Sequence, residues 1–241
     1  MCTVVVEVRP GESTRVLAVR DEDPERPWDG PGEWWPTSRP EVIGVRDRRA
    51  NGAWLALAQD PGRLGVILNR APATGAFAGA APTESRGGLV LDAVSGRVVP
   101  DQPRTGPFNL VEVSAEATHV TSWDGLTLRR ETLSPGVHMI AHHLVDDTHT
   151  ARIERWLPEF TAAAELSSDG DWQSRWLAVL ERSAQLGPED DRAIIRDNTV
   201  HGYPTLSLLV CLAEVRENGV GLTSANLTEP GRWNTPVFSP A

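Results

Sequence analysis

The chain contains no lysine, so all 23 of its basic residues are arginines. This absence excludes catalysis through a Schiff base on a lysine amine. The formal net charge is −10, so the chain also lacks the basic surplus of nucleic-acid-binding proteins, and we expect no nucleic-acid partner. Long apolar runs are missing as well. The longest lies near residues 206–213 and is too short to span a bilayer, so we expect no membrane partner.

Cysteine is scarce too, with Cys2 and Cys211 far apart in the sequence. Two cysteines form no disulfide framework, and no secretory signal is recognisable, so we expect a cytoplasmic protein. Cys211 lies in an apolar segment whose alternation groups it with Ser207 and Leu209 on one face of a strand. We therefore predict a packed, inert Cys211 thiol that forms no bond with Cys2.

The rest of the composition indicates a folded domain. Hydrophobic residues make up 40% of the chain and there are nine tryptophans, so we predict one packed domain over residues 1–241. Alternating, β-branched segments predict strands joined in hairpins by turns such as Asp60-Pro61-Gly62. Helical spacing predicts helices within 84–94, 147–166 and 171–186. This order predicts an α+β fold in which sheet stacks on sheet and the helices lie outside.

The helix expected within 147–166 carries the clearest local signals. Asp147 or Thr148 is its expected N-cap, and Pro158 is expected to kink or end it. Its charged residues, such as Arg152, are expected on a solvent-exposed face.

Residues 21–40 form a long segment rich in proline, glycine and tryptophan. The segment is too irregular for a regular element and too aromatic for a free linker. Loops of this length inside a domain are usually functional or packed down. Trp28, Trp34 and Trp35 are therefore candidates to line a substrate pocket, and the alternative is that they pin the loop onto a sheet.

Cys2 carries the most chemistry, because it directly follows Met1. Removal of Met1 would leave an α-amino group and a thiol on one residue, as an N-terminal nucleophile requires. Arg20 and Asp21 follow at the end of the second expected strand. A nearby arginine lowers the pKa of a thiol and a carboxylate can orient an amine, so we expect a depressed Cys2 pKa. The alternative is that Cys2 is an ordinary buried residue of a first strand.

The histidines cluster once, at His138, His142, His143 and His149. On a strand His138 and His142 would share a face, because even spacing keeps side chains on one side. No cysteine or carboxylate accompanies them at convincing ligand spacing, so we predict no metal site. The alternative to a ligand role is that these histidines are partly exposed strand and helix-cap residues.

Three segments in order resemble the NRDE family, which includes the transport and Golgi organization protein 2 homologues. They are MCT at the start, LAVRDEDPERPW at residues 17–28 and NGAWLALAQDPGRLGVILNR at residues 51–70. Val19 stands where the family signature has asparagine. Weaker similarities follow in RGGLVLD and PFNLVEVS, so the resemblance covers the first half of the chain well and the second half loosely.

The NRDE family is similar to the N-terminal nucleophile hydrolases, in particular the cholylglycine hydrolase and penicillin V acylase group. The resemblance implies an αββα four-layer sandwich of two antiparallel sheets flanked by helices, with Cys2 as nucleophile and base at the end of a central strand. By position it implies Arg20 beside the thiolate, Asp21 holding the new amine, and Asn69 at the oxyanion site. No cofactor is needed for that chemistry.

Two positions depart from those hydrolases. His142 stands where they have an asparagine, and because a histidine N–H could donate to an oxyanion, we count it among the candidate catalytic residues. Pro204 stands where they have a late arginine, and proline can donate nothing. Two functions therefore stay open: a cysteine amidohydrolase acting on a small amide, and a non-catalytic small-molecule carrier on the same fold. Relatives have been linked to haem handling, so haem on a histidine or on Cys2 is an alternative ligand.

Overall fold

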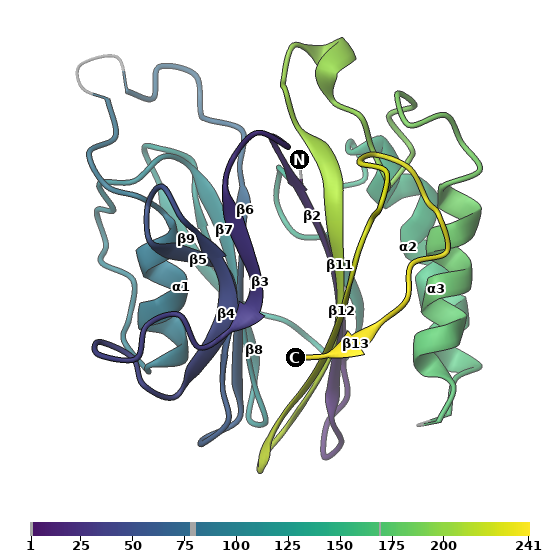
Figure 1. Ribbon diagram of the computed structural model, residues 1–241, viewed down its shortest axis with the longest axis horizontal. Coiled ribbons are helices and arrows are strands. Elements are labelled where there is room, and N and C mark those ends of the chain that lie inside the picture. Colours follow the sequence, from purple (N-terminus) through teal and green to yellow (C-terminus); the bar gives the residue numbers. More distant parts are fainter. Residues whose placement is uncertain (1, 78–80, 169) are drawn as a thin grey trace.

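The computed structural model describes residues 2–77, 81–168 and 170–241. Two antiparallel sheets face each other, and helices cover both outer faces (Figure 1). The layers run from helix α1 through a seven-stranded sheet and a six-stranded sheet to helices α2 and α3. This arrangement is the α+β sandwich that the sequence predicts.

The six-stranded sheet has the order β10-β1-β2-β11-β12-β13. Its strands are β1 (Thr3–Val8), β2 (Thr14–Glu22), β10 (Gly136–Ile140), β11 (Leu206–Arg216), β12 (Gly219–Asn226) and β13 (Ser239–Pro240). Thr3 pairs with Val19 across β1 and β2, so the N-terminal end of the chain lies next to β2 (Figure 1). This register brings Cys2 beside Arg20 and Asp21, which are eighteen and nineteen positions further along the sequence.

The seven-stranded sheet follows the chain in order from β3 to β9. Its strands are β3 (Trp28–Gly32), β4 (Val42–Asp47), β5 (Gly52–Ala58), β6 (Arg63–Asn69), β7 (Phe108–Ser114), β8 (Thr118–Trp123) and β9 (Leu128–Thr132). The expectation that residues 21–40 hold no regular element is wrong for β3, which pairs with β4. The pairing shifts register between Asp29 and Gly32, and this irregularity hides the period of two in the sequence.

Alternation along the central strands separates two parts of the core. Val4 and Ala18 face the opposite sheet, whereas Val5 and Leu17 pack against the helices. The same alternation turns Cys2 toward the space between the sheets. At the start of β1, Cys2 therefore faces the space between the sheets, and the next residue, Thr3, faces the helices.

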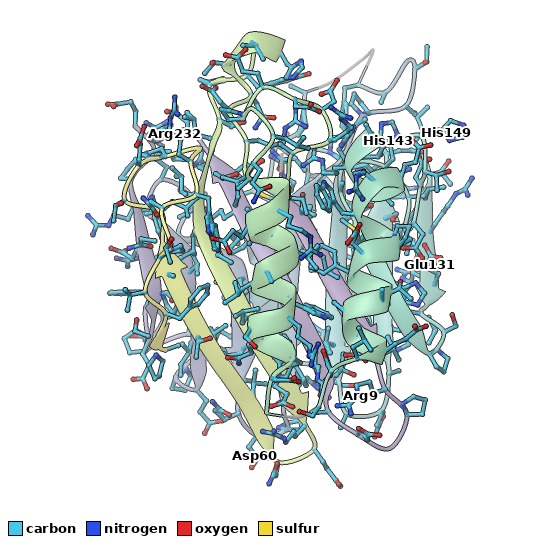
Figure 2. The ribbon with its side chains drawn as sticks, turned by 90° about the vertical axis from the view of Figure 1, so that its right-hand side faces the viewer. Arg9, Asp60, Glu131, His143, His149 and Arg232 are labelled. Carbon is cyan, nitrogen blue, oxygen red and sulfur yellow. The ribbon has the colours of Figure 1, made fainter. Side chains whose placement is uncertain are left out.

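The helices are α1 (Gly87–Val94), α2 (Ala151–Glu165) and α3 (Trp172–Ser183), with a short 3-10 helix η1 (Thr199–His201). Figure 2 shows α2 and α3 lying across the six-stranded sheet. No helix of the described residues is long and apolar enough to cross a membrane.

Helix α2 differs from its sequence prediction in two respects. Its N-cap is Thr150 rather than Asp147 or Thr148, and it continues through Pro158 instead of ending there. Buried apolar residues lie on both sides of the proline, so packing on the sheet stabilises the helix where local propensity does not.

Strand β11 contains a register shift at the point where it meets the end of β2. Ser207 pairs with Asp21, but Leu209 pairs with Arg20, so one residue of β11 is extra. Leu209 and Cys211 face the opposite sheet, while the Ser207 hydroxyl bonds the Asp21 side chain. The grouping of Ser207 with Cys211 on one face is therefore wrong, because the shift breaks the alternation.

Candidate active site around Cys2

A pocket of about 480 Å³ lies where the start of β1 and the end of β2 face strands β5 and β6. Four residues singled out from the sequence line it, namely Cys2, Arg20, Asp21 and Asn69. These four residues lie far apart in the sequence and meet at this pocket. Met1 lies outside the described residues, so the structure does not bear on its removal.

The Cys2 side chain is 7% exposed and is held by the backbone of Asp21. The Asp21 N–H donates to Cys2 Sγ at 3.4 Å, and Sγ lies 3.6 Å from the Asp21 carbonyl oxygen. Burial raises the pKa of the Cys2 thiol, and the Asp21 carboxylate raises it further; the Arg20 charge acts in the opposite direction but does not prevail. In the chain that still carries Met1 the Cys2 pKa is therefore raised, opposite to the expected depression, and the thiol is neutral at pH 7. The expectation itself concerns the form in which a free Cys2 amine adjoins the thiol.

Arg20 is 2% exposed and lines the pocket. Its Nη2 lies 3.4 Å from Glu22 Oε2, and the Trp28 ring centroid lies 5.0 Å from its guanidinium carbon. Burial lowers its pKa from the ordinary value, although a guanidinium stays charged at neutral pH. Its Nη1 is buried and has no hydrogen-bond partner among the described residues.

The Asp21 carboxylate is fixed from the helix side of the sheet. Ser207 Oγ donates to Asp21 Oδ1 at 2.6 Å, and Asn198 Nδ2 donates to Oδ2 at 3.4 Å. Arg196 supports both partners, because its backbone N–H donates to Ser207 Oγ at 2.8 Å and its Nε donates to Asn198 Oδ1 at 3.1 Å. A buried network thus orients the carboxylate that adjoins Cys2.

A second buried arginine, Arg152, belongs to the first turn of α2. It is 2% exposed, and its Nη1 donates to Thr3 Oγ1 at 3.0 Å, so its placement on a solvent-exposed face is wrong. Burial, together with the nearby Arg196 charge, lowers its pKa to about 10. Pro204, where a late arginine was expected, is exposed. Arg152 and Arg196 therefore supply positive charge on the helix side of the site, although Pro204 stands at the position of the late arginine of the hydrolases.

On the opposite wall, Asn69 ends β6 with an exposed side chain at the pocket. Arg86, directly before α1, lines the same wall and donates from Nη1 to the Pro107 carbonyl at 3.0 Å. Helix α1 lies close because Gly52 and Gly87 pack backbone to backbone: a Cβ on Gly52 would lie 2.6 Å from Gly87 Cα.

His142 is the one predicted catalytic residue that is not among the residues lining the pocket. Its carbonyl accepts from the Ala71 N–H at 2.9 Å, and Asn109 Nδ2 donates to the carbonyls of Ala141 and His143 on either side. Burial, together with the nearby Arg152 charge, lowers the His142 pKa to about 3, so the ring is neutral. The predicted place of His142 in the catalytic set is therefore not supported by its position.

The other clustered histidines are engaged by carboxylates. His138 Nδ1 lies 2.7 Å from Asp146 Oδ2, and its Nε2 meets a backbone carbonyl at 2.8 Å. His143 and His149 both approach Asp147, at 3.7 and 2.9 Å, at one end of the molecule (Figure 2). Across residues 2–77, 81–168 and 170–241, no three histidine, cysteine or acidic side chains are grouped as a metal site.

Haem would need an axial ligand in the same pocket. Among the described residues that line it, Cys2 is the candidate, because a cysteine thiolate is one of the axial ligands of haem iron. Charged side chains make up much of the remaining lining. A lining this rich in charged side chains is a poor fit for the apolar faces of haem.

The three tryptophans of residues 21–40 pin the segment rather than line the pocket. Trp34 Nε1 donates to the Gly30 carbonyl at 2.8 Å, and Trp35 Nε1 donates to the Asn51 carbonyl at 2.9 Å. Trp28 reaches the pocket only through Arg20, on which it stacks. The contacts therefore favour the pinning alternative over a direct substrate contact.

The sequence does not assign several residues to the site. Arg86, Arg196, Asn198 and Ser207 lie far from the N-terminal motif, and their neighbourhood depends on a helix start, a loop and a register shift. The helical pattern places Arg152 on the polar face of its helix, and it gives no sign that this part of the first turn is buried.

Comparison with known proteins is consistent with this site. Residues 1–207 match the family model described as transport and Golgi organisation 2, and this range includes every residue of the pocket and of the network around Asp21. No match was found among curated proteins. Strands β12 and β13 lie beyond the matched range but complete the six-stranded sheet. Because the match covers most of its length, the chain belongs to the transport and Golgi organisation 2 family, the group indicated by the NRDE resemblance.

Proposed function

We propose that this protein is a cysteine N-terminal nucleophile amidohydrolase that acts on a small amide. The observation that carries the proposal is the arrangement at Cys2. Its sulfur lies against the Asp21 N–H in a pocket that Arg20, Asp21 and Asn69 also line. A thiol and a side-chain amide line one pocket, and the Asp21 carboxylate is fixed on the helix side of the strand beside Cys2; these are the groups that such an enzyme requires.

The reaction begins once Met1 has been removed, so that Cys2 carries a free amine. The amine takes the thiol proton while Sγ attacks the amide carbon, and the carbonyl electrons move onto oxygen. Collapse of this intermediate breaks the C–N bond, and the ammonium gives its proton to the departing amine. The product is a thioester on Cys2. The amine then deprotonates a water molecule, which attacks the thioester, releases the acid and restores the thiol.

The raised pKa of Cys2 determines when its proton moves. Because burial keeps the thiol neutral, a base must remove the proton during attack rather than before it. Asp21, held by Ser207 and Asn198, would orient the amine that acts as this base. Asn69 would donate its amide N–H to the developing oxyanion.

A second candidate function is a small-molecule carrier that keeps the fold and the pocket but does not turn over. The neutral, buried thiol favours it, since such a thiol is a weak nucleophile unless a base acts on it. The hydrolases have an asparagine at the position of His142, but His142 lies outside the pocket lining. Asn69 is therefore left as the side-chain donor that the resemblance places at the oxyanion.

A panel of small chromogenic amides distinguishes the two functions. We expect hydrolysis by the wild type and none by Cys2→Ala. Asn69→Ala should lower kcat about 100-fold or more, as expected for loss of an oxyanion donor. Asn218→Ala, in the exposed β11–β12 turn, is the matched control and should not change kcat. Hydrolysis that persists in Cys2→Ala would contradict the proposal, and saturable binding without hydrolysis would favour the carrier.

A further inference from the structure

We propose that the Cys2 pocket recognises a carboxylate on its substrate, bound by Arg20 and Arg86 beside the first turn of α1. The inference deepens the proposed function and rests on it. It narrows the substrate to small amides that carry a carboxylate within a few bonds of the scissile carbonyl. Three features of the pocket wall support it independently.

The first feature is the free donor on Arg20. The residue is 2% exposed and lines the pocket, yet its Nη1 has no hydrogen-bond partner among the described residues. A buried guanidinium N–H left unsatisfied is costly, and an anionic oxygen from a ligand would satisfy it. Glu22 takes only Nη2, at 3.4 Å, and the Trp28 ring keeps the guanidinium plane in place.

The second feature is Arg86, on the facing wall. Its Nη1 is anchored on the Pro107 carbonyl, which fixes the head group in the lining of the pocket. Burial lowers the Arg86 pKa, whereas the Glu22 carboxylate and, to a smaller extent, the negative charge of a Cys2 thiolate would raise it, so Arg86 lies within electrostatic range of both side chains. Because the thiol is neutral, neither Arg20 nor Arg86 is neutralised by Cys2.

The third feature is the start of helix α1. Gly87, its first residue, lines the pocket, and no acidic residue lies in its first turn. The positive end of the helix therefore adds to the field of the two arginines. The close backbone contact of Gly52 with Gly87 holds this helix end at the pocket wall.

The acidic residues of the pocket indicate a singly charged ligand. The lining also includes a third arginine, Arg26, and four acidic residues, namely Asp21, Glu22, Asp47 and Glu84. The acidic charges would repel a dianion more strongly than a monoanion. Two oxygens on a planar group can bridge two guanidinium groups. A carboxylate meets both conditions, whereas a phosphate monoester carries nearly two charges at neutral pH.

The test compares two alkylating reagents of similar size on the folded protein: iodoacetate, which carries a carboxylate, and iodoacetamide, which is neutral. Both react with the same thiolate, so the ratio of their rates at Cys2 is independent of the Cys2 pKa. We expect this ratio to exceed the ratio measured for Cys2 in the urea-unfolded chain by about tenfold. Peptide mass spectrometry gives both rates.

Variants of Arg86 test whether this residue causes the raised ratio of iodoacetate to iodoacetamide rates. Arg86→Gln should bring the ratio back toward the unfolded value, and Arg86→Lys should restore part of it, because the charge returns without the planar fork. Arg97→Gln is the matched control. It removes one positive charge from an exposed residue beyond the other end of α1 and should leave the ratio unchanged. Thermal unfolding of each variant shows whether it is folded.

A ratio equal to that of the unfolded chain, or one that ignores Arg86, would overturn the inference. So would protection of Cys2 by inorganic phosphate in preference to acetate, which would mean a different anion. The labelling needs no turnover, so the two proposals can fail separately. A high ratio without amide hydrolysis would support the carboxylate site and contradict the amidohydrolase. Hydrolysis of neutral amides with a ratio equal to that of the unfolded chain would support the amidohydrolase and contradict the carboxylate site.

Discussion

Replacing Ser207 with alanine tests the network that orients Asp21. The Ser207 hydroxyl donates to Asp21 Oδ1 at 2.6 Å and accepts from the backbone N–H of Arg196 at 2.8 Å. Ser207 has no exposed surface, and Asp21 and Arg196 are also buried. Alanine removes both hydrogen bonds at once and leaves little room for water to replace them.

The magnitude follows from these two contacts. A hydrogen bond to a charged group contributes about 1.5–3 kcal/mol, and a buried N–H left without a partner costs about 1–3 kcal/mol. Because the two effects overlap at one hydroxyl, we expect Ser207→Ala to lower the free energy of unfolding by about 2–4 kcal/mol. The loosened Asp21 carboxylate should also lower kcat on any amide that the protein hydrolyses.

Urea unfolding followed by tryptophan fluorescence measures the change. Ser174→Ala is the matched control, since its hydroxyl also donates a hydrogen bond, to the Asp171 carbonyl at 2.8 Å, but at an exposed position. The control should change the free energy of unfolding by less than about 0.5 kcal/mol. A Ser207→Ala variant as stable as the control would refute the reasoning that this network holds Asp21.

Three further outcomes are expected. Burial raises the pKa of Cys211 to about 12, so Cys211 should resist iodoacetamide in the folded protein and react after unfolding; rapid labelling of the native thiol would contradict this. Asp146 raises the pKa of His138, so their pairing stabilises the fold below the unfolded histidine pKa of about 6.5 and is lost as pH rises through the raised value. The stability lost in His138→Gln should therefore be larger at acidic than at alkaline pH, and a pH-independent loss in urea unfolding would sink the idea. Gly52→Ala would place a Cβ 2.6 Å from Gly87 Cα, so it should lower the free energy of unfolding by about 1–3 kcal/mol; an unchanged midpoint would show that α1 is not held there.

The part of the site that the sequence predicts is the part made by neighbouring strands. Cys2, Arg20 and Asp21 belong to a hairpin, so turn signals and strand length are enough to place them together. The amphipathic helices and most hairpins follow from periodicity for the same reason. Asn69 depended on the family resemblance, because its strand lies in the other sheet.

The rest depends on tertiary features that leave no local pattern. A register shift in β11 turns Ser207 toward Asp21, and alternation alone predicts the opposite face. The helical pattern predicts that Arg152 is a surface residue, but in the fold its guanidinium is buried and donates to Thr3 Oγ1 of β1. The sign of the Cys2 pKa shift depends on how deeply the thiol is buried, which outweighs the effect of Arg20.

The most direct test of the central claim compares two forms of the chain. One form is cut by a site-specific protease so that it begins at Cys2, and the other keeps an N-terminal extension. Both are incubated with a thiol-reactive acyl probe and weighed intact. We predict an acyl adduct on Cys2 that forms and then hydrolyses in the first form, and no such turnover in the second, where the amine is blocked. Equal acylation and release in both forms, or none in either, would contradict the account of Cys2 as an N-terminal nucleophile.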